Sequence, residues 1–249
     1  MNRINKPMSY DLTYFKHGLE ELHVSLTGEQ IEQFLQYYEM LVEKNKVMNL
    51  TGITEFEEVI KKHFLDSLSL IRVLPDLADQ NLKIIDLGTG AGFPGLPLKI
   101  AFPNLEITLM DSLNKRINFL NEVIDALGLQ KVTAVHGRAE EMAANAVHRQ
   151  QYDLCVSRAV SNLAVLTEYC LPFVAKGGMF VSYKSADSDA EIQEAKKAIS
   201  ILGGKLGKID KFELPDSNLG RALVCINKVK DTPKKYPRKA GTPAKLPLK

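Results

Sequence analysis

A glycine-rich turn between a strand-like run and a helix start is the feature that most constrains the fold of this chain. The mostly apolar run Leu82–Leu87 is followed closely by Gly88, Gly90 and Gly92. Glycine tolerates positive φ angles and lets the backbone approach a ligand closely. A strand that passes through such a turn into a helix is typical of the first βα unit of an open α/β sheet, where ligands bind at the carboxyl ends of the strands.

The chain after residue 81 alternates between strand-like and helix-like segments. This alternation predicts a mainly parallel sheet with helices on both faces. The expected strands are 82–87, 106–110, 132–136, 152–157, 179–183, 208–214 and 221–227, and the expected helices are 95–101, 113–127, 163–174 and 190–202. The last two strands flank a turn at Pro215–Asn218, which predicts a hairpin. We therefore expect an α/β, Rossmann-like fold with a mostly parallel seven-stranded sheet and an antiparallel last strand.

The first 80 residues are expected to form an N-terminal helical extension. Thr27 and Gln30 have the spacing of a capping box, and apolar residues follow at helical spacing as far as Asn49. A second helix is expected from Glu55 to Leu74 and stops before Pro75. The expected organisation is an extension at 1–80, an α/β core at 81–229 and a tail at 230–249.

The tail differs from the rest of the chain in charge. Seven Lys and Arg residues against one Asp give residues 230–249 a net charge of +6, so the other residues carry −4 of the total of +2. Four prolines in this segment argue against a helix or strand. We expect a disordered basic tail that either attracts nucleic acid phosphates or only improves solubility.

Composition argues against several classes of protein. Apolar residues make up 45% of the chain, but no apolar run reaches the roughly 18–20 residues of a membrane helix. Residues 1–10 lack the apolar stretch of a signal peptide, so a cytoplasmic protein is expected. The three cysteines form no Cys-x-x-Cys pair, which argues against a disulfide framework or a metal site.

The residues of the glycine turn favour one kind of ligand. A dinucleotide-binding turn reads Gly-x-Gly-x-x-Gly, and here Phe93 stands where its last glycine would be. Asp86 would repel a pyrophosphate but suits S-adenosylmethionine, which carries an ammonium and a sulfonium group. The pattern resembles motif I of the Rossmann-like methyltransferases and makes Asp86, Gly88, Gly90 and Phe93 candidate cofactor-binding residues. An NAD-dependent oxidoreductase is disfavoured by Asp86 and Phe93.

The ends of the next two expected strands supply further candidates. Asp111 ends the second strand, where a carboxylate can accept hydrogen bonds from the ribose of a cofactor. It is also placed to cap the following helix. The third strand leads to the segment 137–141, the expected rim for an adenine, in which Glu140 is either a contact or an exposed first-turn acid.

The residues after the fourth strand restrict the substrate. Enzymes that methylate exocyclic base amines carry an Asp/Asn-Pro-Pro-aromatic motif there, but this chain has Ser157-Arg158-Ala159-Val160. No cysteine has the Pro-Cys context of a cytosine-C5 nucleophile. A ring nitrogen with a free lone pair, such as guanine N7, needs no deprotonation, so positioning can supply most of the rate. Arg158 could bind guanine O6, a phosphate or the cofactor carboxylate, or pair with a local acid.

Several motifs together resemble one family in order and spacing. They are Asn49-Leu50-Thr51, His63-Phe64-Leu65-Asp66-Ser67, the loop 86–95, Asp111-Ser112 with Lys115-Arg116, Ser157-Arg158-Ala159 and Tyr183-Lys184. The chain over roughly residues 19–229 is similar to the RsmG family, also called GidB, bacterial methyltransferases of guanine N7 in small-subunit ribosomal RNA. The resemblance implies a class I methyltransferase fold, S-adenosylmethionine as cofactor and 16S rRNA of the small ribosomal subunit as substrate and partner.

The resemblance also implies roles for single residues. Gly88 and Phe93 are expected to contact the cofactor at the loop, and Ala139 and Glu140 on the adenine side. Arg158 is expected to contact the cofactor or to act as the catalytic arginine of the active site.

Polar residues outside the loop are candidates for RNA contact. His63, Asp66 and Ser67 share one helix face, and we expect this face to close over the loop or the RNA rather than to form a hydrolase triad. An ordinary helix–sheet contact is the alternative. Lys115, Arg116 and Lys184 lie near the carboxyl ends of strands and could contact phosphates, with solvated surface as the alternative.

Other functions remain open at this point. The same fold hosts small-molecule and protein methyltransferases, and a non-catalytic RNA-binding protein with a degenerate cofactor site is a further alternative. No heptad repeat or apolar dimer stripe is evident in the sequence, so we expect a monomer. Since no apolar run is long enough for a membrane helix, we also expect no membrane partner.

Overall fold

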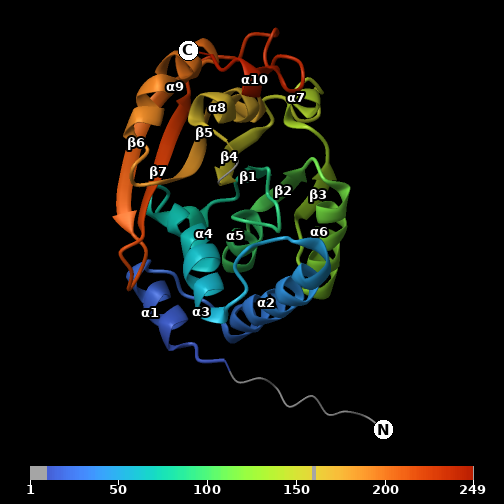
Figure 1. Ribbon diagram of the computed structural model, residues 1–249, viewed down its shortest axis with the longest axis vertical. Coiled ribbons are helices and arrows are strands. Elements are labelled where there is room, and N and C mark those ends of the chain that lie inside the picture. Colours follow the sequence, from blue (N-terminus) through green and yellow to red (C-terminus); the bar gives the residue numbers. More distant parts are fainter. Residues whose placement is uncertain (1–9, 159–160, 249) are drawn as a thin grey trace.

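The fold is built on one seven-stranded sheet with helices on both faces, as the computed structural model shows (Figure 1). The structure describes residues 10–158 and 161–248, so Ala159 and Val160 of the fourth-strand motif and the start of the extension lie outside the described residues. Among the described residues, no helix is long and apolar enough to cross a membrane.

The strands confirm the expected fold class. Their order in the sheet is β3-β2-β1-β4-β5-β7-β6, with parallel pairing from β3 through β5 and antiparallel pairing of β7 with both β5 and β6. The hairpin predicted at the end of the chain is therefore present, with its last strand inserted beside β5. The bounds are β1 Lys83–Leu87, β2 Glu106–Asp111, β3 Val132–His136, β4 Tyr152–Arg158, β5 Val174–Ser185, β6 Gly204–Glu213 and β7 Gly220–Lys228.

Helices bury both faces of this sheet in two separate cores. Neighbouring residues of β1 illustrate the alternation, since Ile84 belongs to one core and Ile85 to the other, and both are fully buried. The first core contains residues of the N-terminal helices, α5 and α6, and the second contains residues of α8 and α9. The bounds are α5 Gly95–Ala101, α6 Asn114–Ala126, α7 Ala139–Met142, α8 Leu163–Cys170, the 3₁₀ turn η4 Leu171–Phe173, α9 Asp189–Ile201 and α10 Thr242–Lys245.

The N-terminal helices pack beside α5 and α6 in the first core. After α1 (Thr13–Glu21), α2 (Gly28–Met48) begins with the predicted capping box, in which the Gln30 N–H donates to Thr27 Oγ1 at 3.2 Å and the Thr27 N–H to Gln30 Oε1 at 2.8 Å. The helix ends at Asn49, whose φ of 50° is left-handed. Its fully buried Phe34 and Tyr37 fix it to the first core.

The segment expected to form one helix from Glu55 to Leu74 is helical but not uniform. It consists of α3 (Phe56–Val59), the π-helix η1 (Ile60–Leu65), α4 (Asp66–Leu68) and the 3₁₀ turn η2 (Ser69–Arg72), and the 3₁₀ turn η3 (Leu77–Asp79) follows. In the π-turn the carbonyls of Lys62 and His63 accept hydrogen bonds from the Arg158 guanidinium. π-turns of this kind often mark functional sites, and apolar spacing alone cannot distinguish them from regular helix.

The C-terminal tail, residues 230–248, differs from the disordered segment that its composition predicted. Thr232 and Tyr236 are only 3% and 8% exposed, and the Arg149 guanidinium donates to the carbonyls of both. Arg238 pairs with Glu168 of α8, which is fully buried. The composition favoured disorder because it counts charges and prolines, whereas the buried partners that hold this segment lie elsewhere in the chain.

Candidate active site

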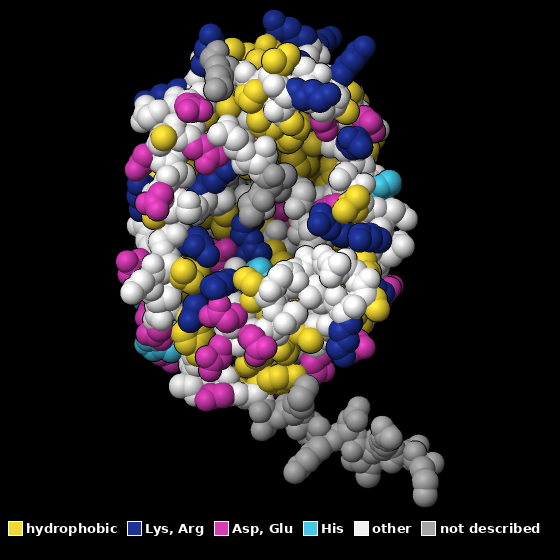
Figure 2. Space-filling model, in the orientation of Figure 1, with side chains coloured by type: hydrophobic (Ala, Val, Ile, Leu, Met, Phe, Trp, Pro, Cys, Tyr) yellow, Lys and Arg dark blue, Asp and Glu magenta, His cyan; other side chains and the backbone are white. Residues whose placement is uncertain are grey.

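A cavity of about 930 Å³ opens at the carboxyl ends of β1, β2, β3 and β4. The switch in strand order between β1 and β4 lies at this edge, where open α/β sheets bind their ligands. Lys and Arg side chains gather around the central hollow of this face (Figure 2). The cavity is lined by most of the predicted site residues, namely Gly88, Gly90, Phe93, Asp111, Ala139, Glu140, Arg158, His63, Arg116 and Lys184.

The glycine loop is held by backbone hydrogen bonds and by α2. The Gly88 N–H donates to the Met110 carbonyl at 2.9 Å, and the Tyr37 hydroxyl donates to the Ala91 carbonyl at 2.6 Å. Gly92 has a φ of 110°, and a Cβ there would lie 2.4 Å from Leu96 Cδ1 and 2.8 Å from the Tyr37 hydroxyl. Glycine is therefore required at this position both for the backbone angle and for the close approach of α2 and α5.

Asp86 lies behind the loop and not on the cavity wall. It is fully buried, and its Oδ2 accepts hydrogen bonds from the Thr89 hydroxyl at 2.6 Å and the Gly95 N–H at 2.8 Å. Its Oδ1 has no hydrogen-bond partner. Burial raises the pKa of this carboxyl to about 7. Asp86 was predicted to contact a cationic ligand directly, but it lies behind the loop, where it binds Thr89 and Gly95.

Asp111 joins the loop to the second strand and to α6. Its Oδ2 accepts hydrogen bonds from the Gly90 N–H at 3.0 Å and from Arg116 Nη1 at 3.1 Å, and its Oδ1 from the Leu113 N–H at 2.9 Å. Arg116, predicted to contact RNA phosphates, therefore forms an ion pair with Asp111. The two readings of Asp111 from the sequence are both compatible with this geometry, since it lines the cavity and also holds the turn before α6.

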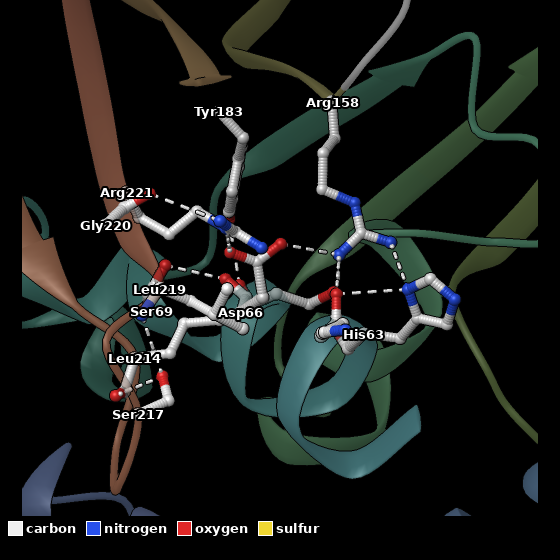
Figure 3. A network of polar contacts seen from close by, with 12 residues as sticks. His63, Asp66, Ser69, Arg158, Tyr183, Leu214, Ser217, Leu219, Gly220 and Arg221 are labelled. Carbon is white, nitrogen blue, oxygen red and sulfur yellow. Dashed lines mark hydrogen bonds and ion pairs between the residues drawn. The ribbon is translucent and has the colours of Figure 1, made fainter. Parts of the chain in front are cut away.

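The opposite wall of the cavity is a network centred on Arg158 and Asp66 (Figure 3). Arg158 Nη1 donates to Asp66 Oδ2 at 2.8 Å and to the Lys62 carbonyl at 3.1 Å, and its guanidinium lies 5.0 Å from the centre of the Phe93 ring. Arg221 Nε donates to Asp66 Oδ1 at 3.1 Å. One carboxylate, only 3% exposed, thus serves two guanidinium groups, which leaves this wall with one positive charge in excess.

His63 belongs to the same network as a neutral ring. It stacks on Phe93 at 4.5 Å between centroids, and its Nε2 and Nδ1 lie 2.9 Å from Thr51 Oγ1 and 3.2 Å from Arg158 Nη2. Burial, and then the charge of Arg158, lower the pKa of His63 to about 3. The ring is therefore uncharged at neutral pH, so a charged contact with RNA, one form of its predicted role, does not fit.

The other predicted RNA contacts have different surroundings. Lys184 Nζ donates to Glu191 Oε1 and to the Ser161 carbonyl, both at 2.6 Å, so its charge is already paired. Lys115 is exposed and only approaches the Met48 carbonyl at 3.4 Å. Of the four predicted contacts, Lys115 alone is exposed and carries a charge that is not in a described ion pair.

Arg221, Gly241 and Tyr169 are among the cavity residues that were not predicted from the sequence. Arg221 reaches the site because β7 inserts beside β5, where it pairs with Ser185. Gly241 comes from the tail, and its N–H donates to Glu140 Oε1 at 3.0 Å. Tyr169 comes from α8. No local pattern marks these three residues, because each reaches the cavity through a long-range contact.

Comparisons with known proteins show the family of this chain. The family described as "GidB: rRNA small subunit methyltransferase G" matches residues 30–220. A curated ribosomal RNA small subunit methyltransferase G from Lachnoclostridium phytofermentans is 55% identical over 238 residues, covering 96% of this chain and 98% of that protein. Its counterpart from Desulforamulus reducens is 52% identical and covers 96% and 99%.

A solved structure extends the comparison at the level of the fold. It is a variant of a 16S rRNA (adenine(1408)-N(1))-methyltransferase from Catenulisporales acidiphilia with its cosubstrate SAM. It matches with a TM-score of 0.50 at 13% identity, over 65% of this chain and 92% of that one. At this identity the likeness shows a shared Rossmann-like methyltransferase fold.

Proposed function

Because the chain belongs to the GidB family, the ribosomal RNA small subunit methyltransferases G, we propose that it methylates N7 of a guanine in 16S rRNA with S-adenosylmethionine as donor. The observation that carries this proposal is that, in a chain of this family, the glycine loop and Arg158 line the same cavity. The substrate is then the small ribosomal subunit or its RNA, and the enzyme is proposed to act as a cytoplasmic monomer.

The residues of the cavity fit this cofactor. S-adenosylmethionine, when bound, supplies an electrophilic methyl group on a sulfonium. Loop residues Gly88 and Gly90 leave room for close approach, the Asp111 carboxylate offers oxygens to a ribose, and Ala139 and Glu140 form the rim for the adenine. The positive charge in excess around Arg158 suits a carboxylate or a phosphate.

The far wall supports a target that needs no deprotonation. Near Arg158 the candidate bases are Asp66, which is held by two guanidinium groups, and His63, whose pKa of about 3 makes it a weak proton acceptor at neutral pH. A ring nitrogen such as guanine N7 carries its own lone pair, so orientation against the methyl donor supplies most of the rate. In this proposal Arg158 orients the guanine or the cofactor and takes no proton.

A methylation assay with small subunits tests the proposal. Purified protein and S-adenosylmethionine with a labelled methyl group are incubated with subunits from cells that lack the gene, and the RNA is mapped by mass. Incorporation of one N7-methylguanine is expected, and subunits from cells that have the gene should accept no label. Labelling of proteins or small molecules in a cell extract, with none in ribosomal RNA, would favour the alternative methyltransferase classes.

A further inference from the structure

We propose that the C-terminal tail forms one wall of the cofactor cavity and that its attachment sets the affinity for the cofactor. This inference rests on the proposed function. Gly241 lines the cavity, and its N–H donates to Glu140 Oε1 at 3.0 Å. Glu140 lies in the first turn of α7, a helix of only four residues whose residues Ala139 and Glu140 face the same cavity.

The root of the tail is fixed by hydrogen bonds from two basic side chains of the core. Lys228 is 1% exposed, and its Nζ donates to the Leu171 carbonyl at 2.6 Å and to the Thr232 hydroxyl. Arg149 donates to the carbonyls of Ala143, Thr232 and Tyr236 at 3.1, 2.9 and 2.9 Å. Since Ala143 directly follows α7, the same guanidinium ties the end of this helix to the tail.

A buried ion pair holds the next part of the tail. Both oxygens of Glu168, which is fully buried in α8, accept hydrogen bonds from Arg238. Oε1 also accepts the backbone N–H of Arg238 at 2.8 Å. A buried carboxylate is unfavourable without a partner, so Glu168 strongly favours the conformation in which Arg238, and with it Gly241 three residues later, is in place.

The contact with Glu140 gives this arrangement a function. A carboxylate has two acceptor oxygens, and the tail occupies Oε1, which orients the other oxygen and fixes the first turn of α7. Without the tail, Glu140 and α7 would have to become ordered when the cofactor binds, and that ordering would weaken binding. The coupling is reciprocal, so a bound cofactor should also stabilise the tail.

The test separates the wall from the charge of the tail. A wall variant ends after Tyr236 and carries Glu168→Gln, so the contacts of Arg149 are kept and no buried carboxylate is left alone. A charge variant keeps the wall and carries Lys230→Gln, Lys234→Gln and Lys245→Gln, at three exposed positions. Calorimetry with S-adenosylhomocysteine measures cofactor affinity, and filter binding of 16S rRNA over a salt series measures RNA affinity.

The wall variant is expected to bind S-adenosylhomocysteine about tenfold more weakly, whereas the charge variant keeps the affinity of the full chain and loses only RNA affinity. Equal affinity of the full chain and the wall variant overturns the inference. If the full chain itself binds no S-adenosylhomocysteine, the proposed function fails first.

A second measurement on the full chain keeps the inference testable if the wall variant does not fold. Trypsin cleavage after the exposed Lys239 should become at least about fivefold slower when S-adenosylhomocysteine saturates the protein, because opening of the tail would then release bound ligand. An unchanged cleavage rate at saturating ligand overturns the inference.

Discussion

Two walls of the cavity, the loop wall and the network wall, are built in different ways. The loop wall consists of the Gly88–Gly92 turn and Asp111, within one short stretch of chain, and its contacts are mainly backbone N–H groups and carbonyls. The network wall joins Asp66 to Arg158 and Arg221, which follow it by 92 and 155 residues in the sequence. Its contacts are made by charged side chains.

This difference separates what each wall can recognise. A wall of backbone groups and glycines offers shape and close approach, which suits a constant part of the reaction such as the cofactor. A wall of guanidinium groups with one carboxylate between them offers charge and directed hydrogen bonds. We infer that the network wall carries the selectivity for the methyl acceptor, and the predictions below test whether the walls are independent.

Removing the shared carboxylate should have the largest effect. Asp66→Ala leaves two arginines, with side chains 12% and 24% exposed, without their common partner. The expected loss of unfolding free energy is about 3–5 kcal/mol, measured by urea denaturation. Asp210→Ala is the control, because it removes a carboxylate that also pairs with two cations, Arg72 and Lys208, at more exposed positions, and it should cost about 0–1 kcal/mol. Equal losses in the two variants would contradict the network.

The buried Asp86 should make stability depend on pH. Its pKa is raised from 3.8 to about 7 in the folded protein, so the folded state binds the proton more tightly than the unfolded chain. The stability due to this group is complete below pH 4 and is lost as the pH rises to about 7.

Asp86→Asn removes this loss and isolates its contribution. The variant should exceed the original protein in unfolding free energy by a margin that grows from pH 4 to pH 7 and reaches about 2–4 kcal/mol. Denaturant unfolding of the ligand-free proteins at several pH values measures it. A margin that stays constant or shrinks over this range would show that the carboxyl is ionised in the folded protein at low pH.

Two glycines of the loop provide a matched pair with a smaller effect. Gly92→Ala places a Cβ against Leu96 and Tyr37 at a φ of 110° and should cost about 2–3 kcal/mol. Gly90→Ala has a φ of 62° and no atom within 4 Å of its Cβ, so only the backbone strain of about 1 kcal/mol is expected. Thermal unfolding with and without S-adenosylhomocysteine compares the two variants. Equal losses of stability would argue against the close contact of Gly92 with Tyr37 of α2.

The smallest effect is expected at the rim of the cavity. Lys115→Gln should make the fall of log affinity with log salt concentration for 16S rRNA less steep by about 1, and should weaken binding a few-fold. Lys184→Gln should leave the slope unchanged, since its ammonium group already pairs with Glu191. A larger slope change at Lys184 than at Lys115 would reverse this assignment.

The loop wall could be predicted closely from the sequence because its interactions are local. The order strand, glycine turn and helix determines where Gly90 and Asp111 meet, and the mostly apolar run at residues 82–87 predicts the strand that leads into the turn. The capping box at Thr27 was predictable for the same reason, since its two hydrogen bonds lie within four residues.

The network wall and the tail could not be predicted to the same extent. Pairing of Arg158 with an acid was one of the alternatives left open by the sequence, but nothing in the sequence indicated that the acid is Asp66 or that Arg221 joins the pair across the sheet. His63 was expected as an RNA contact, but burial against Phe93 keeps it neutral. The tail was expected to be disordered because its composition is rich in charges and prolines. Composition does not describe the buried site at which Glu168 pairs with Arg238.

The π-turn at residues 60–65 has a consequence for synthesis of the chain. Its carbonyls and the Asp66 carboxylate leave the ribosome long before Arg158 and Arg221, their partners 92 or more residues later, have been made. The nascent helical extension therefore carries an unpaired carboxylate on the surface that will later face the sheet. We expect this end of the protein to gain its final shape only when β4 and β7 have formed, so the methyl-accepting side of the site matures after the glycine loop.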